Sequence, residues 1–158
     1  MSLNGKTATT TDVVIENNGF WPSVELQVFI NLFRIPAEYT PDTIAHEFNA
    51  AVRIINTDVS EALIAAKDAG LTEVSEIEGL KDDYRDALYN YARQRLVRVF
   101  ETLNRKEAAD VQGDRANEVT DRWVFESARF VNRVNRSLTE YAESEGVASA
   151  DGFRVSLL

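Results

Sequence analysis

Apolar residues recur at every third or fourth position through a long run in the first half of the chain, and this spacing restricts the run to one kind of structure. The run consists of Ile44, Phe48, Val52, Ile55, Val59 and Leu63. Residues at this spacing share one face of an α-helix, whereas a half-buried strand would place them at alternate positions. Thr40 is a good N-cap, Pro41 suits the first helical position, and Gly70 suits the position after the last turn. The pattern predicts one helix of about seven turns, from residue 41 to near residue 69.

Two later stretches carry the same signature. The first begins near Asp82 and ends before a break at residues 108–113, and its apolar stripe is Tyr84, Leu88, Tyr91, Ala92, Leu96, Val99, Phe100 and Leu103. The second begins near Asp114 and fades at residues 143–146, and its stripe is Val119, Trp123, Val124, Phe130, Val131, Val134, Leu138 and Tyr141. A short helix is expected over residues 24–33, and residues 71–80 form a connector with at most one helical turn. Short loops favour antiparallel neighbours, so we expect a mainly α fold: an antiparallel bundle of three long helices plus a short N-terminal helix.

Short β-type segments are expected at both ends of this bundle. Val13-Val14-Ile15 is a β-branched run, and the segment Phe153–Leu158 alternates well enough to form a strand. Residues 1–12 are predicted to be a flexible tail, followed by a single domain over residues 13–158. Two lone strands form a marginal sheet in water, so they should pair together on the bundle or pair with another copy. Because unpaired strand edges seek partners, these segments are a first indication of an oligomer.

The charge is acidic and unevenly distributed. The formal net charge is −9; residues 1–80 hold 4 basic and 12 acidic residues, and residues 81–145 hold 12 basic and 13 acidic residues. This balance argues against tight binding to a phosphate backbone. It fits an ordinary surface, or an acidic face along which nucleic acid passes without being held. No stretch is long and apolar enough to span a bilayer, so no membrane partner is expected.

No arrangement of residues in the sequence points to catalysis, a metal or a cofactor. The chain has no cysteine, which removes thiolate metal sites. Its single histidine, His46, lacks a second histidine at metal-binding spacing. Asp82-Asp83 is interpreted as a helix start, because adjacent helical residues point in different directions and cannot face each other across a cleft. Ser127 lies within a helix without a histidine partner. We therefore expect no catalytic, cofactor-binding or metal-binding residue, and no enzymatic activity.

Arginines are concentrated in the second half of the chain, among them Arg85, Arg93, Arg95, Arg98, Arg105, Arg115, Arg122, Arg129, Arg133 and Arg136. Acidic residues are interleaved at helical neighbour spacing, so any single arginine is best interpreted as part of a solvated surface with weak ion pairs. As a group they favour pairing between subunits, provided that the chain is an oligomer.

The most distinctive short motif is Asn17-Asn18-Gly19-Phe20-Trp21-Pro22, just ahead of the first helical run. Asparagine and glycine tolerate positive φ, so the motif predicts a turn that carries two aromatic rings. The rings either plug one end of the bundle or anchor a partner, since aromatic residues dominate both cores and interfaces. The residues alone do not separate these roles. Phe20, Trp21 and Pro22 are therefore candidate interface residues, together with Val155 and Leu157 of the C-terminal segment.

These features resemble the head completion, or head stabilisation, proteins of temperate contractile-tailed bacteriophages, often called the GPL family. The resemblance rests on Asn18-Gly19-Phe20-Trp21-Pro22, Thr40-Pro41 with Ile44 and Ala45, Tyr84, Ala87, Tyr89, Ala92, Ala116, Asp121 and the tail Val155–Leu158. It runs from about Val14 to the C-terminus, and Gly-Phe-Trp-Pro is its most specific part. It implies no cofactor and no reaction, and it supplies no catalytic residue.

What the resemblance implies is a structural role in the virion. Such proteins join the packaged capsid at the portal vertex after DNA entry, and they resemble adaptor subunits that form a ring of twelve beneath the portal. The implied partners are the portal protein, tail or neck proteins, other copies of the chain, and genomic DNA that passes through the channel without specific binding. Assembly is expected in the cytoplasm of the bacterial host, and the gene can belong to a prophage.

Three other classes remain open at this point. A helical, oligomeric adaptor or regulator without a capsid role has the same sequence features. A DNA-binding helical protein is disfavoured by the charge balance. An enzyme built on carboxylates or His46 is the least favoured. For the connector role, the sequence suggests that the C-terminal strand or the Val13–Ile15 run adds to a strand edge on a neighbouring subunit.

Overall fold

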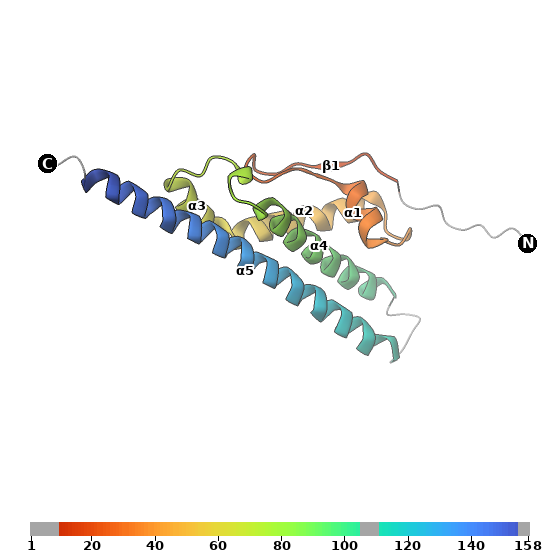
Figure 1. Ribbon diagram of the computed structural model, residues 1–158. Coiled ribbons are helices and arrows are strands. Elements are labelled where there is room, and N and C mark those ends of the chain that lie inside the picture. The colour runs from red at the N-terminus through yellow and green to blue at the C-terminus, as the bar shows by residue number, and fades with distance from the viewer. Residues whose placement is uncertain (1–9, 105–110, 155–158) are drawn as a thin grey trace, which may run out of the picture.

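The computed structural model describes the backbone of residues 10–104 and 111–154, and the side chains of residues 10–99 and 121–145. Within these backbone ranges the elements are two strands, five helices and one 3₁₀ turn (Figure 1). In chain order they are β1 (Val14–Ile15), β2 (Val24–Glu25), α1 (Leu26–Phe33), α2 (Pro41–Asp58), α3 (Ser60–Asp68), the 3₁₀ turn η1 (Val74–Glu76), α4 (Leu80–Asn104) and α5 (Val111–Arg154). The mainly helical fold is confirmed, although the arrangement is richer than a bundle of three helices.

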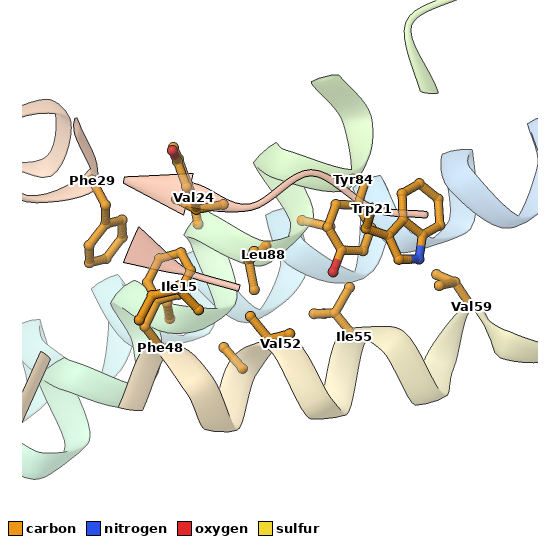
Figure 2. Packing of buried hydrophobic residues seen from close by; sticks show 14 of the residues in the cluster. Ile15, Trp21, Val24, Phe29, Phe48, Val52, Ile55, Val59, Tyr84 and Leu88 are labelled. Atoms are coloured by element: carbon orange, nitrogen blue, oxygen red, sulfur yellow. The ribbon is translucent and has the colours of Figure 1, made fainter. Parts of the chain in front are cut away.

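The helices form an elongated stack in which α5 runs the whole length of the molecule (Figure 1). Helix α4 packs beside α5, α2 packs on α4, and α3 packs on α5. Leu88 and Leu96 of α4 and Val134 and Leu138 of α5 are fully buried, as the predicted stripes require. The core continues across α2 to the two strands, so the strands are covered by helices on their inner face (Figure 2).

The predicted seven-turn helix is divided at Val59, which is a correction to the expectation from periodicity. Val59 has φ −105° and ψ 1°, and it ends α2 immediately before α3 begins. Side-chain hydrogen bonds use the carbonyls at this point: Ser60 Oγ donates to the Thr57 carbonyl at 2.7 Å, and Asn135 Nδ2 of α5 donates to the Asp58 carbonyl at 3.2 Å. Such bonds compete with the helical ladder and bend the chain. The apolar stripe nevertheless continues, because Val59 itself is fully buried.

The helix starts fit the residues that precede them. Thr40 Oγ1 accepts a hydrogen bond from the Thr43 amide at 3.2 Å, and Pro41 occupies the first turn, so the predicted N-cap is confirmed. Gly70 has φ +112°, which is the conformation expected for glycine after a helix. The connector after it contains only the three-residue turn η1, also as predicted.

The first strand pairs with a segment that was expected to be helical, and not with the C-terminal segment as one expectation had it. Strand β1 pairs antiparallel with β2, with Val14 opposite Glu25 and Ile15 opposite Val24. The predicted helix over residues 24–33 therefore begins two residues later, at Leu26. The reason is that the turn at residues 17–22 returns the chain beside β1, where backbone groups of residues 24–25 are satisfied by the strand.

Helix α5 is longer at both ends than its sequence indicates. It starts at Val111, includes Gly113 within the predicted break, and continues through Gly146 to Arg154. A glycine costs only about 1 kcal/mol inside a helix, and neighbouring alanines and glutamates are strong helix formers. The predicted C-terminal strand is therefore wrong at Phe153 and Arg154, which are helical. Val155 and Leu157 lie outside the described residues. Among the helices of the described ranges, none combines the length and apolar character needed to cross a membrane.

Candidate interface around the aromatic turn

Residues 17–22 form the predicted turn, and its backbone is fixed by one asparagine. Asn18 Oδ1 accepts hydrogen bonds from the amides of Phe20 and Trp21, each at 3.2 Å. Gly19, between Asn18 and Phe20, has a backbone φ of +87°, and residues other than glycine rarely adopt this conformation. These hydrogen bonds and the glycine conformation fix the turn, so that the neighbouring side chains of Phe20 and Trp21 point in different directions.

Trp21 points into the core and stacks on Tyr84 of α4. The ring centroids are 4.0 Å apart and the planes differ by 4°. The Phe20 ring meets Trp21 edge-on, with centroids 4.9 Å apart and an angle of 84°. Only 2% of Trp21 is exposed, and Figure 2 shows the stacked pair on the side of the core that also holds Ile55 and Val59. The plug role is therefore present in the fold for Trp21.

Three polar side chains close a ring of hydrogen bonds beside this stack. Tyr84 Oη donates to Asn56 Oδ1 at 2.6 Å, Asn56 Nδ2 donates to Asn17 Oδ1 at 2.9 Å, and Asn17 Nδ2 donates to Tyr84 Oη at 2.8 Å. Each group donates once and accepts once within the ring, so each of the three side chains has both a donor partner and an acceptor partner. The ring joins the aromatic turn to α2 and α4 and fixes where the turn sits.

Burial of the hydroxyl raises the pKa of Tyr84 to about 12, against a smaller lowering by the hydrogen bond from Asn17. In the unfolded chain this tyrosine ionises near pH 10, whereas in the folded chain it keeps its proton up to about pH 12. The contribution of the buried hydroxyl to the free energy of unfolding is therefore complete below pH 10 and is lost as the pH rises to about 12. The expected loss from this group is about 2–3 kcal/mol. Urea unfolding at pH 9 and pH 11.5 measures it.

Tyr84→Phe is the matched control for this prediction, because it keeps the stacked ring and removes the ionisable hydroxyl. The variant should be less stable at neutral pH, but it should lose less stability than the wild-type protein between pH 9 and pH 11.5. Parallel losses in the two proteins would show that the buried hydroxyl does not couple to folding.

Phe20 and Pro22 lie at the surface side of the turn. Phe20 is half-buried, and Lys67 Nζ of α3 lies 4.8 Å from its ring centroid, a cation–π contact. Pro22 lines an open pocket of about 220 Å³ between β2 and α4, together with Ser23, Val24, Glu25, Val28, Lys81, Tyr84, Arg85 and Tyr89. A partner side chain therefore has access to Pro22, and the interface role of the turn stays a prediction.

The other residues considered for chemistry have structural surroundings. His46 is exposed, with its Nε2 3.9 Å from Glu47 Oε1. Asp82 pairs with Arg85 at 2.9 Å, and Asp83 pairs with Arg133 of α5 at 3.2 Å, so both belong to ion pairs of the first turn of α4. Ser127 is buried and donates to the Ala87 carbonyl at 3.0 Å. Within the described ranges, no group of three histidine, aspartate or glutamate side chains is arranged to hold a metal ion.

Sequence reasoning missed two polar contacts that position the helices. Asn56 lies on the buried side of α2, beside Ile55, and a polar residue next to an apolar stripe is the signal that was available. Glu47, next to Phe48, is 8% exposed and bonds Arg95 of α4, with both Nε and a terminal guanidinium nitrogen 2.7 Å from its Oε2. The interleaved charges of α4 gave no way to choose Arg95 among its neighbours.

The chain matches the family described as phage head completion protein (GPL) over residues 15–144. This range begins in β1, includes the aromatic turn and the whole of α1 to α4, and ends within α5. The chain belongs to this family. The GPL proteins are structural proteins of the phage head and not an enzyme family, so the chain has a structural role in the head and its place is the virion.

A curated relative agrees with this assignment. The chain is 26% identical over 113 residues to a "Probable head completion/stabilization protein" of Haemophilus phage HP1 (strain HP1c1), covering 66% of this chain and 75% of the relative. No solved structure matches the chain. The family range stops before Val155 and Leu157, so these two candidate residues lie outside both the matched range and the described residues.

Proposed function

We propose that this GPL protein completes the DNA-filled head by binding at the portal vertex, where copies of it form a ring-shaped connector between head and tail. The observation that carries the proposal is the family match over residues 15–144, which extends from β1 into α5 and therefore covers the folded core. It favours this role over that of a helical regulator without a place in the capsid. The proposed partners are the portal protein, tail or neck proteins and other copies of the chain, in a ring of twelve.

The shape of the molecule supports a connector. Helix α5 has 44 residues, which corresponds to about 66 Å of continuous helix. It lies along one side of the molecule with α4 packed against it (Figure 1). A stiff element of this length gives each subunit a long lateral surface, as a ring of wedge-shaped subunits requires.

The charge supports passage of DNA through such a ring without tight binding. The chain has a formal net charge of −9. Neutralisation of phosphates by lysine and arginine supplies most non-specific affinity for DNA, and an acidic protein lacks that term. In this role Phe20, Pro22, Val155 and Leu157 are candidate contacts to a neighbouring subunit or to the portal.

The proposal predicts the phenotype of a phage that lacks the protein. A stop codon early in the gene, in the phage genome that encodes the chain, should give DNA-containing heads and tails that fail to join. Infectious particles should be lost, because the docking surface between the two structures is missing. Plaque assays and negative-stain microscopy of lysates measure both effects.

Supplying the wild-type chain from a plasmid is the control and should restore joined particles. Particles that are purified without the protein and remain infectious would refute the connector role. Lysates in which heads never retain DNA would instead place the protein at an earlier step of head assembly.

A further inference from the structure

The outer edge of β2 is an unpaired strand edge. The Leu26 amide donates to the Val13 carbonyl at 3.0 Å, which fixes the hydrogen-bond pattern of the two-stranded ladder. In an antiparallel pair, every second residue turns its N–H and C=O groups toward the partner strand, and the residues between turn them away. Because Leu26 and Val24 turn toward β1, Ser23 and Glu25 turn away from it. Within the described backbone, no hydrogen bond uses the amides of these two residues.

This edge borders the open pocket described above, and α4 forms the opposite wall. Residues 22–25 line the pocket on the strand side, and four side chains line it on the helix side: Lys81, Tyr84, Arg85 and Tyr89. Figure 2 shows the chain from Trp21 to Val24 running across α4. The volume of about 220 Å³ is smaller than that of most small-molecule sites, and it suits one side chain of a bound polypeptide. The shape is therefore a groove between a strand edge and a helix, here called the β2–α4 groove.

Tyr89 brings a polar group without a partner to this groove. Only 3% of Tyr89 is exposed, and its ring lies 5.5 Å from that of Phe29, centroid to centroid. Among the described residues, none forms a hydrogen bond with its hydroxyl. Nearly all buried polar groups in folded proteins have a hydrogen-bond partner. The free hydroxyl is a second indication, separate from the strand edge, that the groove receives a polar group such as a backbone carbonyl from a bound chain.

The charges at the groove are mixed and do not select the ligand. Lys81 and Arg85 line it together with Glu25. Arg85 also pairs with Asp82 at 2.9 Å, and Asp86 lies close enough to act on the tyrosine hydroxyl. Two cations therefore lie among three carboxylates, which gives no strong preference for an acidic or a basic partner and does not favour a phosphate backbone. The strand edge and the apolar floor remain as the features that recognise a ligand.

We propose that the β2–α4 groove binds an extended peptide segment of another protein, which pairs with the backbone of Ser23 and Glu25 as a third strand. Hydrogen bonds along the edge supply affinity, and alternate side chains of the peptide supply specificity. One apolar side chain of the peptide enters the pocket beside Pro22 and Tyr84. The inference goes beyond the connector role proposed above and does not depend on it. In a phage particle, such a groove holds an extended arm of a neighbouring component.

Peptides selected on the purified full-length chain test this site. The probes are linear peptides of about six residues, the length of a typical strand, enriched from a random displayed library and then synthesised with blocked ends. Isothermal titration calorimetry measures their Kd. N-methylation of one peptide amide should raise the Kd about threefold to tenfold at alternate positions and change it little at the positions between. The reason is that only every second amide of an added strand pairs with the edge.

Substitutions in the protein give the matching test. Ser23→Pro removes one outward amide, and proline is tolerated at an edge position whose N–H bonds nothing, so urea unfolding should be unchanged. The Kd of the peptides should nevertheless rise about threefold to tenfold. Val28→Trp enlarges a side chain that lines the pocket and is 47% exposed, so it should weaken binding at least about tenfold. Ile64→Trp enlarges a 60% exposed side chain of α3, away from the groove, and should leave the Kd unchanged.

The outcomes separate this inference from the connector role. An alternating effect of N-methylation, with binding weakened by Val28→Trp and not by Ile64→Trp, supports the added strand. The inference is overturned if no peptide is enriched, if neither tryptophan variant changes the Kd, or if N-methylation acts equally at every position. If Ser23→Pro does not fold, the N-methylated peptides on the wild-type chain still decide. Because these measurements use no particles, a phage that remains infectious without the protein would remove the connector role and leave the groove result standing.

Discussion

Replacing Trp21 with alanine is expected to lower the free energy of unfolding by about 4 kcal/mol, the range for loss of a large aromatic side chain from a core. Only 2% of Trp21 is exposed, its ring stacks on Tyr84 with centroids 4.0 Å apart, and the Phe20 ring meets it in an edge-on arrangement. Its removal leaves a cavity between the turn and α4, and it also loosens the turn that carries Asn17 into the polar ring. Urea unfolding followed by far-UV circular dichroism measures the change.

Phe20→Ala is the matched control, because it removes a ring from the same turn. Phe20 is only half-buried, so its loss should cost about 1–2 kcal/mol. If the two substitutions had similar effects, the plug would be the turn as a whole and not Trp21. If Trp21→Ala left the stability unchanged but prevented the joining of heads to tails, the residue would serve mainly as a partner anchor.

Replacing Arg95 with methionine is the second substitution with a large expected effect, at about 2–3 kcal/mol. It removes the cation from Glu47, a residue that is 8% exposed. Glu47 Oε2 accepts a hydrogen bond from Arg95 Nε at 2.7 Å and lies 2.7 Å from a terminal guanidinium nitrogen of the same side chain. The loss arises mainly from a buried carboxylate that no longer has its arginine partner and keeps only His46 nearby, at 3.9 Å. We expect a loss below the largest values known for such pairs, because 30% of the Arg95 side chain is exposed. The same denaturation measurement applies.

The double variant Glu47→Leu/Arg95→Met tests that explanation. It removes both charges and fills the site with apolar atoms of similar size, so it should be more stable than Arg95→Met alone. A double variant that is less stable than the single one would mean that packing of the arginine stem, and not the stranded charge, supplies the energy.

The predictable parts of the candidate site were those decided by neighbouring residues. Asn18 and Gly19 specify the turn through their own side-chain and backbone chemistry, and the structure confirms it. The direction of each ring depends on where α4 lies, because Trp21 stacks on a residue more than sixty positions away. Asn56 was missed for the same reason: its partners, Asn17 and Tyr84, come from two other segments of the chain.

The errors in the fold have a similar origin. Residues 24–25 directly precede helix α1, and their local sequence was read as the start of that helix. They form a strand because β1 lies beside them and pairs with them. At the division of the long helix, the Asp58 carbonyl accepts a hydrogen bond from Asn135, which α5 brings from 77 positions away and which no local pattern predicts. Helix α5 was predicted too short at both ends for a different reason. Gly113 and Gly146 each weaken a helix locally, but α5 continues through both because the residues around them have high helix propensity.

The sequence by itself determined the helical class, the helix caps at Thr40 and Gly70, the aromatic turn and the motif that led to the phage head family. These features are set by the periodicity of apolar residues and by interactions between residues a few positions apart, so they can be predicted from the sequence alone. Only the tertiary structure decided which polar groups are buried together, and which apolar groups remain outside. Val28 and Phe125 occupy helices whose other sides are covered, and no local pattern shows which side that will be. That choice depends on the packing of α1, α4 and α5.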